Sequence, residues 1–251
     1  MSYTDREQTI LNFLQENSSA SVSQLTKLLF ASEATVRRDL GKLEQKGLII
    51  RTHGKAVSTS SYADRSVAFN IREGSANPVK KKIAAAAVRD CITDGTVVIL
   101  DASSTVMHTV EPLADHQGTI AITSGLKTAL LLSESNIRFY STGGKAIGES
   151  SSLVGQTAID TLRTFNADVC FLSCHGLSDG GFVTDTSERE NDLRRVMMEQ
   201  SKRKVLLIDS SKINKNCWHN LCHVSEFDDV YCDMPLPESI EGTIKNFHLI
   251  K

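Results

Sequence analysis

Beyond residue 78 the sequence alternates short apolar runs with segments of helical pattern, and this alternation restricts the fold more than any other feature. We predict strands at 96–100, 119–122, 137–140, 168–173 and 204–208, with shorter ones at 231–232 and 247–250. The predicted helices lie at 80–91, 105–114, 126–133, 156–164 and 188–200. Such alternation is typical of an α/β domain whose parallel, Rossmann-like sheet is covered by helices.

The residues that follow each predicted strand are the candidate ligand contacts, because open parallel sheets bind ligands at the carboxyl ends of their strands. They are rich in hydroxyl groups, glycine and lysine: Asp101, Ser103, Ser104, Thr105, Thr123, Ser124, Gly125, Gly143, Gly144, Lys145, His175, Gly176 and Lys212. Hydroxyl and backbone N–H groups suit a phosphate, lysine supplies the opposite charge, and Asp101 can accept hydrogen bonds from sugar hydroxyls. Each loop alone also fits an ordinary strand-to-helix turn, so the prediction depends on their agreement.

Residues 32–45 have the pattern of a helix that reads DNA. Ser32 can accept a hydrogen bond from a free backbone N–H at the helix start. Val36, Leu40 and Leu43 form one apolar stripe, while threonine and arginine lie on or beside the opposite face. Two shorter helical patterns, at 5–16 and 23–30, come before it. We therefore predict a helix-turn-helix domain.

A small β-ribbon, or wing, is predicted directly after this helix. Two β-prone runs, 48–52 and 55–57, flank the turn His53-Gly54. A recognition helix enters the major groove, and a basic ribbon tip can reach phosphates or the minor groove. The predicted DNA contacts are Ser32, Ala34, Thr35, Arg37, Arg38, Lys42, Arg51, His53 and Lys55. Since the net charge of the chain is −2, this contact must be local.

The stretch Ala-Thr-Val-Arg-Arg-Asp-Leu at 34–40, followed by Leu43, Gly47 and Arg51-Thr52-His53-Gly54, resembles the N-terminal signature of the DeoR family of bacterial repressors. This resemblance implies a winged helix-turn-helix. Lys55 occupies the position of the common second glycine of the wing.

The resemblance continues through the second part of the chain. Asp101 with Ser104-Thr105, Gly143-Gly144, Glu190 and the run 209–212 look like the effector-binding domain of DeoR-type regulators. That domain resembles ribose-5-phosphate isomerase in fold. The resemblance implies a phosphorylated sugar effector that weakens operator binding, and it adds Glu190 and Arg194 to the effector site. Ser103 replaces the family's loop glycine, and Arg194 replaces its usual lysine.

A catalytic role is the less favoured alternative for the second domain. Isomerisation of an aldose phosphate requires a general base, and Asp101, His175, Asp185, Glu188 and Glu190 are available. The same side chains also serve plain hydrogen bonding, and a fused DNA reader favours sensing. We therefore predict a regulator without enzymatic activity.

Metal or redox sensing is a second alternative. The candidate ligands form two groups in the sequence: Cys170, Cys174 and His175, and then Cys217, His219, Cys222 and His223. Neither group has the paired Cys-x-x-Cys spacing of a strong zinc site, and Cys170 lies within a predicted strand. We therefore expect no metal and no cofactor.

Length and apolar content set the remaining expectations. We predict a winged helix-turn-helix domain at 1–58, a linker at 59–78 and an effector-sensing α/β domain at 79–251. No apolar run reaches the roughly 18 residues of a membrane span, and no secretory leader pattern is visible, so a cytoplasmic protein is expected. Helix-turn-helix readers bind paired half-sites, which predicts a homo-oligomer, either dimer or tetramer. Trp218 is predicted to be a packing anchor.

Overall fold

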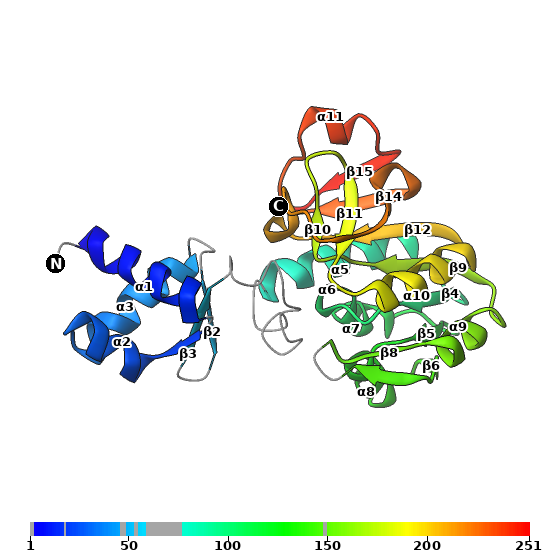
Figure 1. Cartoon of the computed structure of the whole chain (residues 1–251). Helices are drawn as coiled ribbons and strands as arrows, with labels where there is room; N and C mark the ends of the chain where they lie inside the picture. The colour runs from blue at the N-terminus through cyan, green and yellow to red at the C-terminus, as the bar shows by residue number, and fades with distance from the viewer. Residues whose placement is uncertain (1–2, 18, 46–48, 53–54, 59–76, 148–149) are drawn as a thin grey trace. The chain divides into compact units, whose positions relative to one another are not determined.

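The computed structural model describes residues 3–17, 19–45, 49–52, 55–58, 77–147 and 150–251 (Figure 1). The chain divides into two units, Met1–Val67 and Ala68–Lys251. Each unit is described by itself. Among the described helices, none combines the length and apolar character that a membrane crossing requires.

The first unit is a helix-turn-helix with a small sheet. Its helices are α1 Tyr3–Asn17, α2 Val22–Leu29 and α3 Glu33–Gln45. Its strands are β1 Ser19–Ser21, β2 Ile49–Thr52 and β3 Lys55–Ser58, which form an antiparallel sheet in the order β1-β3-β2. The two predicted ribbon strands are therefore present, whereas β1 was not predicted. The predicted turn His53-Gly54 and Gly47 of the family signature lie outside the described residues.

Local capping and a shared core fix the helices of this unit. Ser21 and Gln24 form a capping box at the start of α2. The backbone N–H of Thr35 donates to the hydroxyl of Ser32 at 3.3 Å, which confirms the predicted cap of α3. The predicted apolar stripe is fully buried, together with residues from α1 and α2: Ile10, Leu14, Leu25, Val36, Leu40 and Leu43.

The second unit is built on a seven-stranded parallel sheet, as predicted. Its strands are β4 Val97–Leu100, β5 Ile120–Thr123, β6 Arg138–Ser141, β9 Ala167–Leu172, β12 Ser201–Leu207, β14 Asp229–Cys232 and β15 Asn246–Leu249. They are ordered β15-β14-β12-β9-β4-β5-β6, and every neighbouring pair is parallel. The main helices are α5 Asn77–Cys91, α6 Ser104–Met107, α7 Val110–Leu113, α8 Leu126–Ser133, α9 Gln156–Leu162 and α10 Glu188–Glu199.

Alternating side chains of the strands face two separate cores. Val98 and Leu100 of β4 pack with α5, α6 and α7, whereas Ile99 between them packs with α9 and α10. Helices therefore cover both faces of the sheet, and the carboxyl ends of the strands form one free edge, where ligands bind in such folds.

Three features of the second unit differ from the prediction. Asn77 and Pro78 were assigned to the predicted linker but begin α5, because proline is tolerated in the first helical turn, where its missing N–H has no partner to lose. The predicted helix at 105–114 is two short helices, α6 and α7. Several short elements were missed: the hairpin β7 Lys145–Ile147 with β8 Ser152–Val154, the antiparallel sheet of β10 Gly176–Leu177, β11 Phe182–Asp185 and β13 His219–His223, and α11 Glu238–Glu241.

Candidate functional site

The outward face of α3 carries most of the predicted DNA contacts. Five of them are exposed: Ser32, Ala34, Arg37, Arg38 and Lys42. Thr35 is half-buried, and its hydroxyl shares a hydrogen bond with Ser32 at 2.9 Å. Lys55 is exposed at the start of β3. His53 and the side chain of Arg51 lie outside the described residues.

One ion pair anchors α3 to α1, and a second, exposed pair lies on the cationic face of α3. Buried Asp39 accepts a hydrogen bond from Arg6 of α1 at 2.9 Å, which anchors the helix to its scaffold. Arg37 lies 3.4 Å from Glu33, but both side chains are exposed. Exposed pairs of this kind are worth about 1 kcal/mol or less, so Arg37 can exchange this partner for a phosphate or a base.

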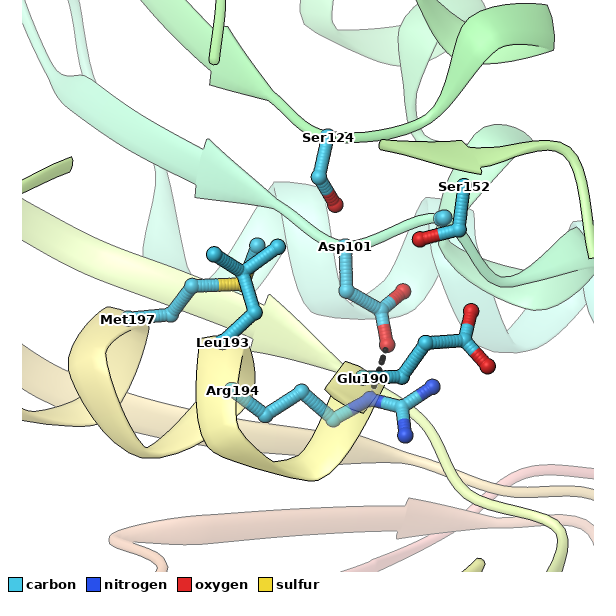
Figure 2. A pocket seen from close by; sticks show the side chains of 8 residues that line it. Asp101, Ser124, Ser152, Glu190, Leu193, Arg194 and Met197 are labelled. Atoms are coloured by element: carbon cyan, nitrogen blue, oxygen red, sulfur yellow. Dashed lines mark hydrogen bonds and ion pairs between the residues drawn. The ribbon is translucent and has the colours of Figure 1, made fainter. Parts of the chain in front are cut away.

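A small pocket opens in the second unit where β4 and β5 end. It is lined by Asp101, Ala102, Ser124, Ser152, Glu190, Leu193, Arg194 and Met197. Figure 2 shows Asp101 and Ser124 after neighbouring strands, Ser152 on β8, and the other labelled side chains facing them from α10. Four predicted effector residues therefore converge here: Asp101, Ser124, Glu190 and Arg194.

Hydrogen bonds of the Asp101 carboxylate link the loop after β4 to the loop after β9 and to α10. One of its carboxylate oxygens accepts from the backbone N–H of Ser103 at 2.8 Å. The other accepts from the N–H of Ser173, after β9, at 3.0 Å and from Arg194 Nε of α10 at 3.1 Å. Because both oxygens already have protein donors, Asp101 shapes the pocket wall more than it offers free acceptors.

Arg194 is a buried cation between two carboxylates. Its Nη1 donates to Asp185 at 2.7 Å and to the side chain of Asn191 at 3.2 Å. His175 Nδ1 lies 2.9 Å from the other oxygen of Asp185. Burial alone would raise the pKa of Asp185, but the charges of Arg194 and His175 outweigh it and hold that pKa well below its ordinary value. The carboxylate of Asp185 is therefore ionised at neutral pH.

Two lysines meet the same sheet edge on the α5 side. Buried Lys80 of α5 donates to the hydroxyl of Ser104 at 3.4 Å. Burial raises the pKa of Asp209, after β12, but the charges of Lys212 and then Lys80 lower it below its usual range. Asp209 Oδ2 is buried and has no hydrogen-bond partner among the described residues. Lys80 was not predicted, because it lies in a helix and follows no strand.

The other predicted effector residues support the edge without lining the pocket. Ser103 caps α6 by accepting from the N–H of Val106 at 3.2 Å, with an ordinary φ of −80°. Its side chain therefore fits where the family's glycine is expected. Thr105 is buried beside it, and the hydroxyl of Thr123 accepts from the N–H of Gly125 at 3.0 Å. Lys145 is exposed on β7.

Three predicted glycines are explained by the close approach of neighbouring atoms. A Cβ on Gly144, where φ is +105°, would lie 2.6 Å from the carbonyl oxygen of Val154. A Cβ on Gly125 would lie 2.8 Å from the hydroxyl of Thr128, and one on Gly176 would clash with the backbone of Lys215. Gly143 has a φ of +63° but open space around it.

Ser152, Leu193 and Met197 were missed as pocket residues. Ser152 lies on a three-residue strand that is too short to give a periodic signal. Leu193 and Met197 are four residues apart on the apolar face of α10, a spacing that indicates a core-facing helix equally well. Trp218 was predicted to be a packing anchor, and this is wrong: its side chain is 64% exposed, and its indole N–H donates to the carbonyl of Thr186.

The cysteines do not assemble into a metal centre. Within the described part of the chain, no three His, Cys, Asp or Glu side chains are grouped to hold an ion. Cys170 and Cys174 are buried thiols, and burial raises the pKa of Cys170 to about 12. A thiol of that pKa carries almost no thiolate at neutral pH, and thiolate is the reactive form.

Comparison with known proteins places both units in one family. Residues 6–62 match the DeoR-like helix-turn-helix domain, and residues 76–234 match the DeoR C terminal sensor domain. The chain is 32% identical over 236 residues to the L-fucose operon activator of Haemophilus influenzae, with 94% of each chain covered. It is 26% identical over 250 residues to the glycerol-3-phosphate regulon repressor of Escherichia coli K12, with 99% and 98% covered.

Among solved structures, ribose 5-phosphate isomerase A of Methanocaldococcus jannaschii is similar at a TM-score of 0.42 and 17% identity, over 55% of each chain. The two family domains together span most of the chain, in the order of the two structural units. The family consists of transcriptional regulators and not of enzymes. This chain, a helix-turn-helix DNA-binding domain followed by an effector-sensing domain, therefore belongs to the DeoR family of transcriptional regulators.

Proposed function

We propose that this protein represses a carbohydrate-use operon and releases its operator when a phosphorylated sugar binds the second unit. The observation that carries the proposal is the meeting, at one sheet edge, of a hydroxyl- and carboxylate-lined pocket with two lysines. Relatives named for fucose and glycerol-3-phosphate regulation support the same class of effector.

The pocket on the α10 side suits the hydroxyl groups of a sugar. The charge of Arg194 is already matched by Asp101 and Asp185. The polar groups left facing the space are the hydroxyls of Ser124 and Ser152 and the carboxylate of Glu190. The carboxylate of Glu190 would repel an anionic group of the ligand. This pocket therefore favours neutral hydroxyl groups, which can donate a hydrogen bond to the carboxylate.

The lysines on the α5 side suit the phosphate. The positive charges of Lys80 and Lys212 both lower the pKa of Asp209, and Lys80 also donates a hydrogen bond to the hydroxyl of Ser104. The buried Oδ2 of Asp209 is open to a donor such as a sugar hydroxyl or a protonated phosphate oxygen. A molecule that spans the strand ends would present hydroxyls to Glu190 and its phosphate to the lysines. Lys145, exposed on β7, stays a predicted contact.

The proposed DNA contacts follow the exposed face of α3. Thr35, Arg37 and Arg38 are near the N-terminal end of the helix, where a recognition helix meets base edges. Lys42 and Lys55 are placed further along, on α3 and β3, and are proposed to bind phosphates.

A thermal-shift panel of sugar phosphates and their unphosphorylated parents tests the effector. A ligand that binds only the native state raises the melting temperature by mass action. We expect one phosphorylated sugar to stabilise the full chain and its parent sugar to have no effect. We also expect Lys80→Met to abolish the shift, while the matched change Lys82→Met, on the exposed side of α5, leaves it intact.

The same panel separates the competing classes of function. Turnover of a sugar phosphate would show that the second unit is an enzyme and not a sensor. A thermal shift given only by zinc or an oxidant would show that the signal is a metal or a redox change.

The DNA-binding part of the proposal is tested with operator DNA, which is obtained by selecting bound fragments from a random pool. Lack of any sequence-selective binding would contradict the repressor assignment.

A further inference from the structure

The second unit exposes an apolar face at one end of its sheet. Helix α8 directs Leu126, Leu130 and Leu131 to solvent, and Leu130 is 60% exposed. Tyr140 of the adjoining strand β6 is exposed too, but it is paired with Ile122 and contacts the ring of Phe165 at a centroid distance of 5.3 Å, so it lies on the other face of the sheet, the α9 side. Scattered exposed leucines are ordinary, but an exposed cluster of them on one helix marks an interaction surface.

The strand beside this helix is also the edge of the sheet. In the described structure β6 pairs with β5 alone and ends the strand order. An uncovered edge strand offers free backbone groups to other chains, so natural proteins usually cover or protect such edges. Among the described residues of this unit, no strand covers the outer side of β6, and helix α8 next to it exposes three leucines.

The charges on α8 specify what covers it. Lys127 and Glu134 are seven residues apart and lie on the same side of the helix as Leu130 and Leu131. When two copies of α8 pack antiparallel about a two-fold axis between these leucines, Leu130 of one copy meets Leu131 of the other. The same arrangement places Lys127 of each copy opposite Glu134 of the other, so the pair forms once on each side of the axis. The face is thus complementary to itself, as a two-fold interface requires.

We propose that the outward face of α8 is the surface through which two copies of this chain associate. A second copy is also the partner that paired DNA half-sites require. The inference rests on the proposed function only in this respect, that the partner is taken to be a second copy.

This surface is directly connected to the candidate pocket. Ser124, which lines the pocket, is two residues before α8. The N–H of Leu126 donates to the carbonyl of Ser151 at 2.8 Å, and the N–H of Leu153 donates to the carbonyl of Ser124 at 2.8 Å. A ligand that contacts Ser124 and Ser152 therefore touches the backbone that anchors α8, which links effector binding to the geometry of the pair.

Sedimentation velocity of the full chain, without DNA or sugar, tests the surface. We expect the wild-type protein to sediment as a dimer or a larger assembly, and Leu130→Glu to weaken association at least tenfold. Leu249→Glu is the matched control, because Leu249 is equally a surface leucine, 41% exposed, on the opposite edge strand β15. It should leave association unchanged. A wild-type monomer, or equal behaviour of the two variants, would overturn the proposal.

A charge exchange tests the antiparallel arrangement without introducing a charge among the leucines. Lys127→Glu and Glu134→Lys should each weaken association, and the double variant should restore it. Weakening by each single change without restoration in the double variant would refute the proposed pairing. Because neither DNA nor effector is present, the outcome is independent of the proposed effector response.

Discussion

At the scale of single residues, Arg194 shows how a side chain at the site serves the fold. Its guanidinium bridges Asp101 after β4 and Asp185 on β11, with both carboxylates buried. Arginine can do this because its planar fork donates in several fixed directions, whereas lysine offers a single ammonium group. The residue at this position therefore sets the rigidity of the pocket wall as well as its charge.

Loss of the Arg194 guanidinium should destabilise the second unit strongly. Arg194→Met leaves two buried carboxylates without their cation, and breaking such a pair costs about 3–5 kcal/mol. Arg195→Met is the control on the same helix, since Arg195 forms an exposed pair with Asp192 and should cost about 1 kcal/mol or less. Urea unfolding of both variants measures the difference, and equal losses would refute the structural role of Arg194.

Asp185 should make the second unit sensitive to acid. The folded-state pKa of this carboxyl is lowered, so its ionisation contributes stability that is present above the unfolded pKa of about 4. That stability falls as the pH decreases below about 4, where the unfolded chain binds the proton first. Asp185→Asn should flatten the dependence of unfolding free energy on pH between about 5 and 3. An unchanged slope would show that other carboxyls dominate.

Phe30 is held in a conformation that opposes its side chain. It ends α2 in the left-handed region, with φ 48° and ψ 41°, and is 97% exposed. Asparagine tolerates this conformation better, and relief of the strain is worth about 1 kcal/mol. Phe30→Asn should therefore stabilise the first unit, as measured by its thermal transition in the full chain. A lower transition temperature would mean that the ring has contacts of its own.

At the scale of elements, the long periodic segments were predictable and the short ones were not. The predicted strands around Val98 and Val169 are each buried at every position but one and have clear turn signals. By contrast, β7, β8 and β13 are short and contain Lys145, Ser152 and His219. Their pairing is set by contacts with distant segments, such as the register of Asp185 with His219. Local sequence patterns carry no record of such contacts.

The candidate site divides in the same way. Asp101 and Ser124 follow buried strands, so the topology of a parallel sheet brings them together. Lys80 and Ser152 reach the same edge from a helix and from a hairpin, and only the folded chain places them there. Glu190 and Arg194 were identified through the family resemblance, and their distance of about 90 residues from Asp101 in the chain explains why spacing alone did not connect them.

The β6–β7 turn offers an element-scale test with a matched pair of glycines. Gly144→Ala combines a positive φ with a contact of 2.6 Å to a backbone oxygen, so it should cost more than the 1–2 kcal/mol or so of left-handed strain alone. Gly143→Ala meets open space and should cost only that strain. Chemical unfolding compares them. Equal destabilisation by the two changes would mean that the hairpin relaxes away from Val154.

At the scale of the whole molecule, the chain joins a helix-turn-helix unit with an exposed cationic helix to a sensor-domain unit that carries the candidate pocket. The proposed regulation requires the two to be separable by mutation. Arg38 lies on the exposed face of α3 in the first unit, and Lys80 is buried in α5 of the second unit.

Operator affinity at fixed salt, with and without the stabilising sugar phosphate, tests the central claim most directly. We predict that the sugar phosphate weakens operator binding by the wild-type chain at least tenfold. Arg38→Ala should lose about 1–3 kcal/mol of specific binding energy but keep the thermal shift, whereas Lys80→Met should bind the operator normally and ignore the sugar phosphate. Unchanged operator affinity in Arg38→Ala, or in the wild-type chain saturated with the sugar phosphate, would contradict the account.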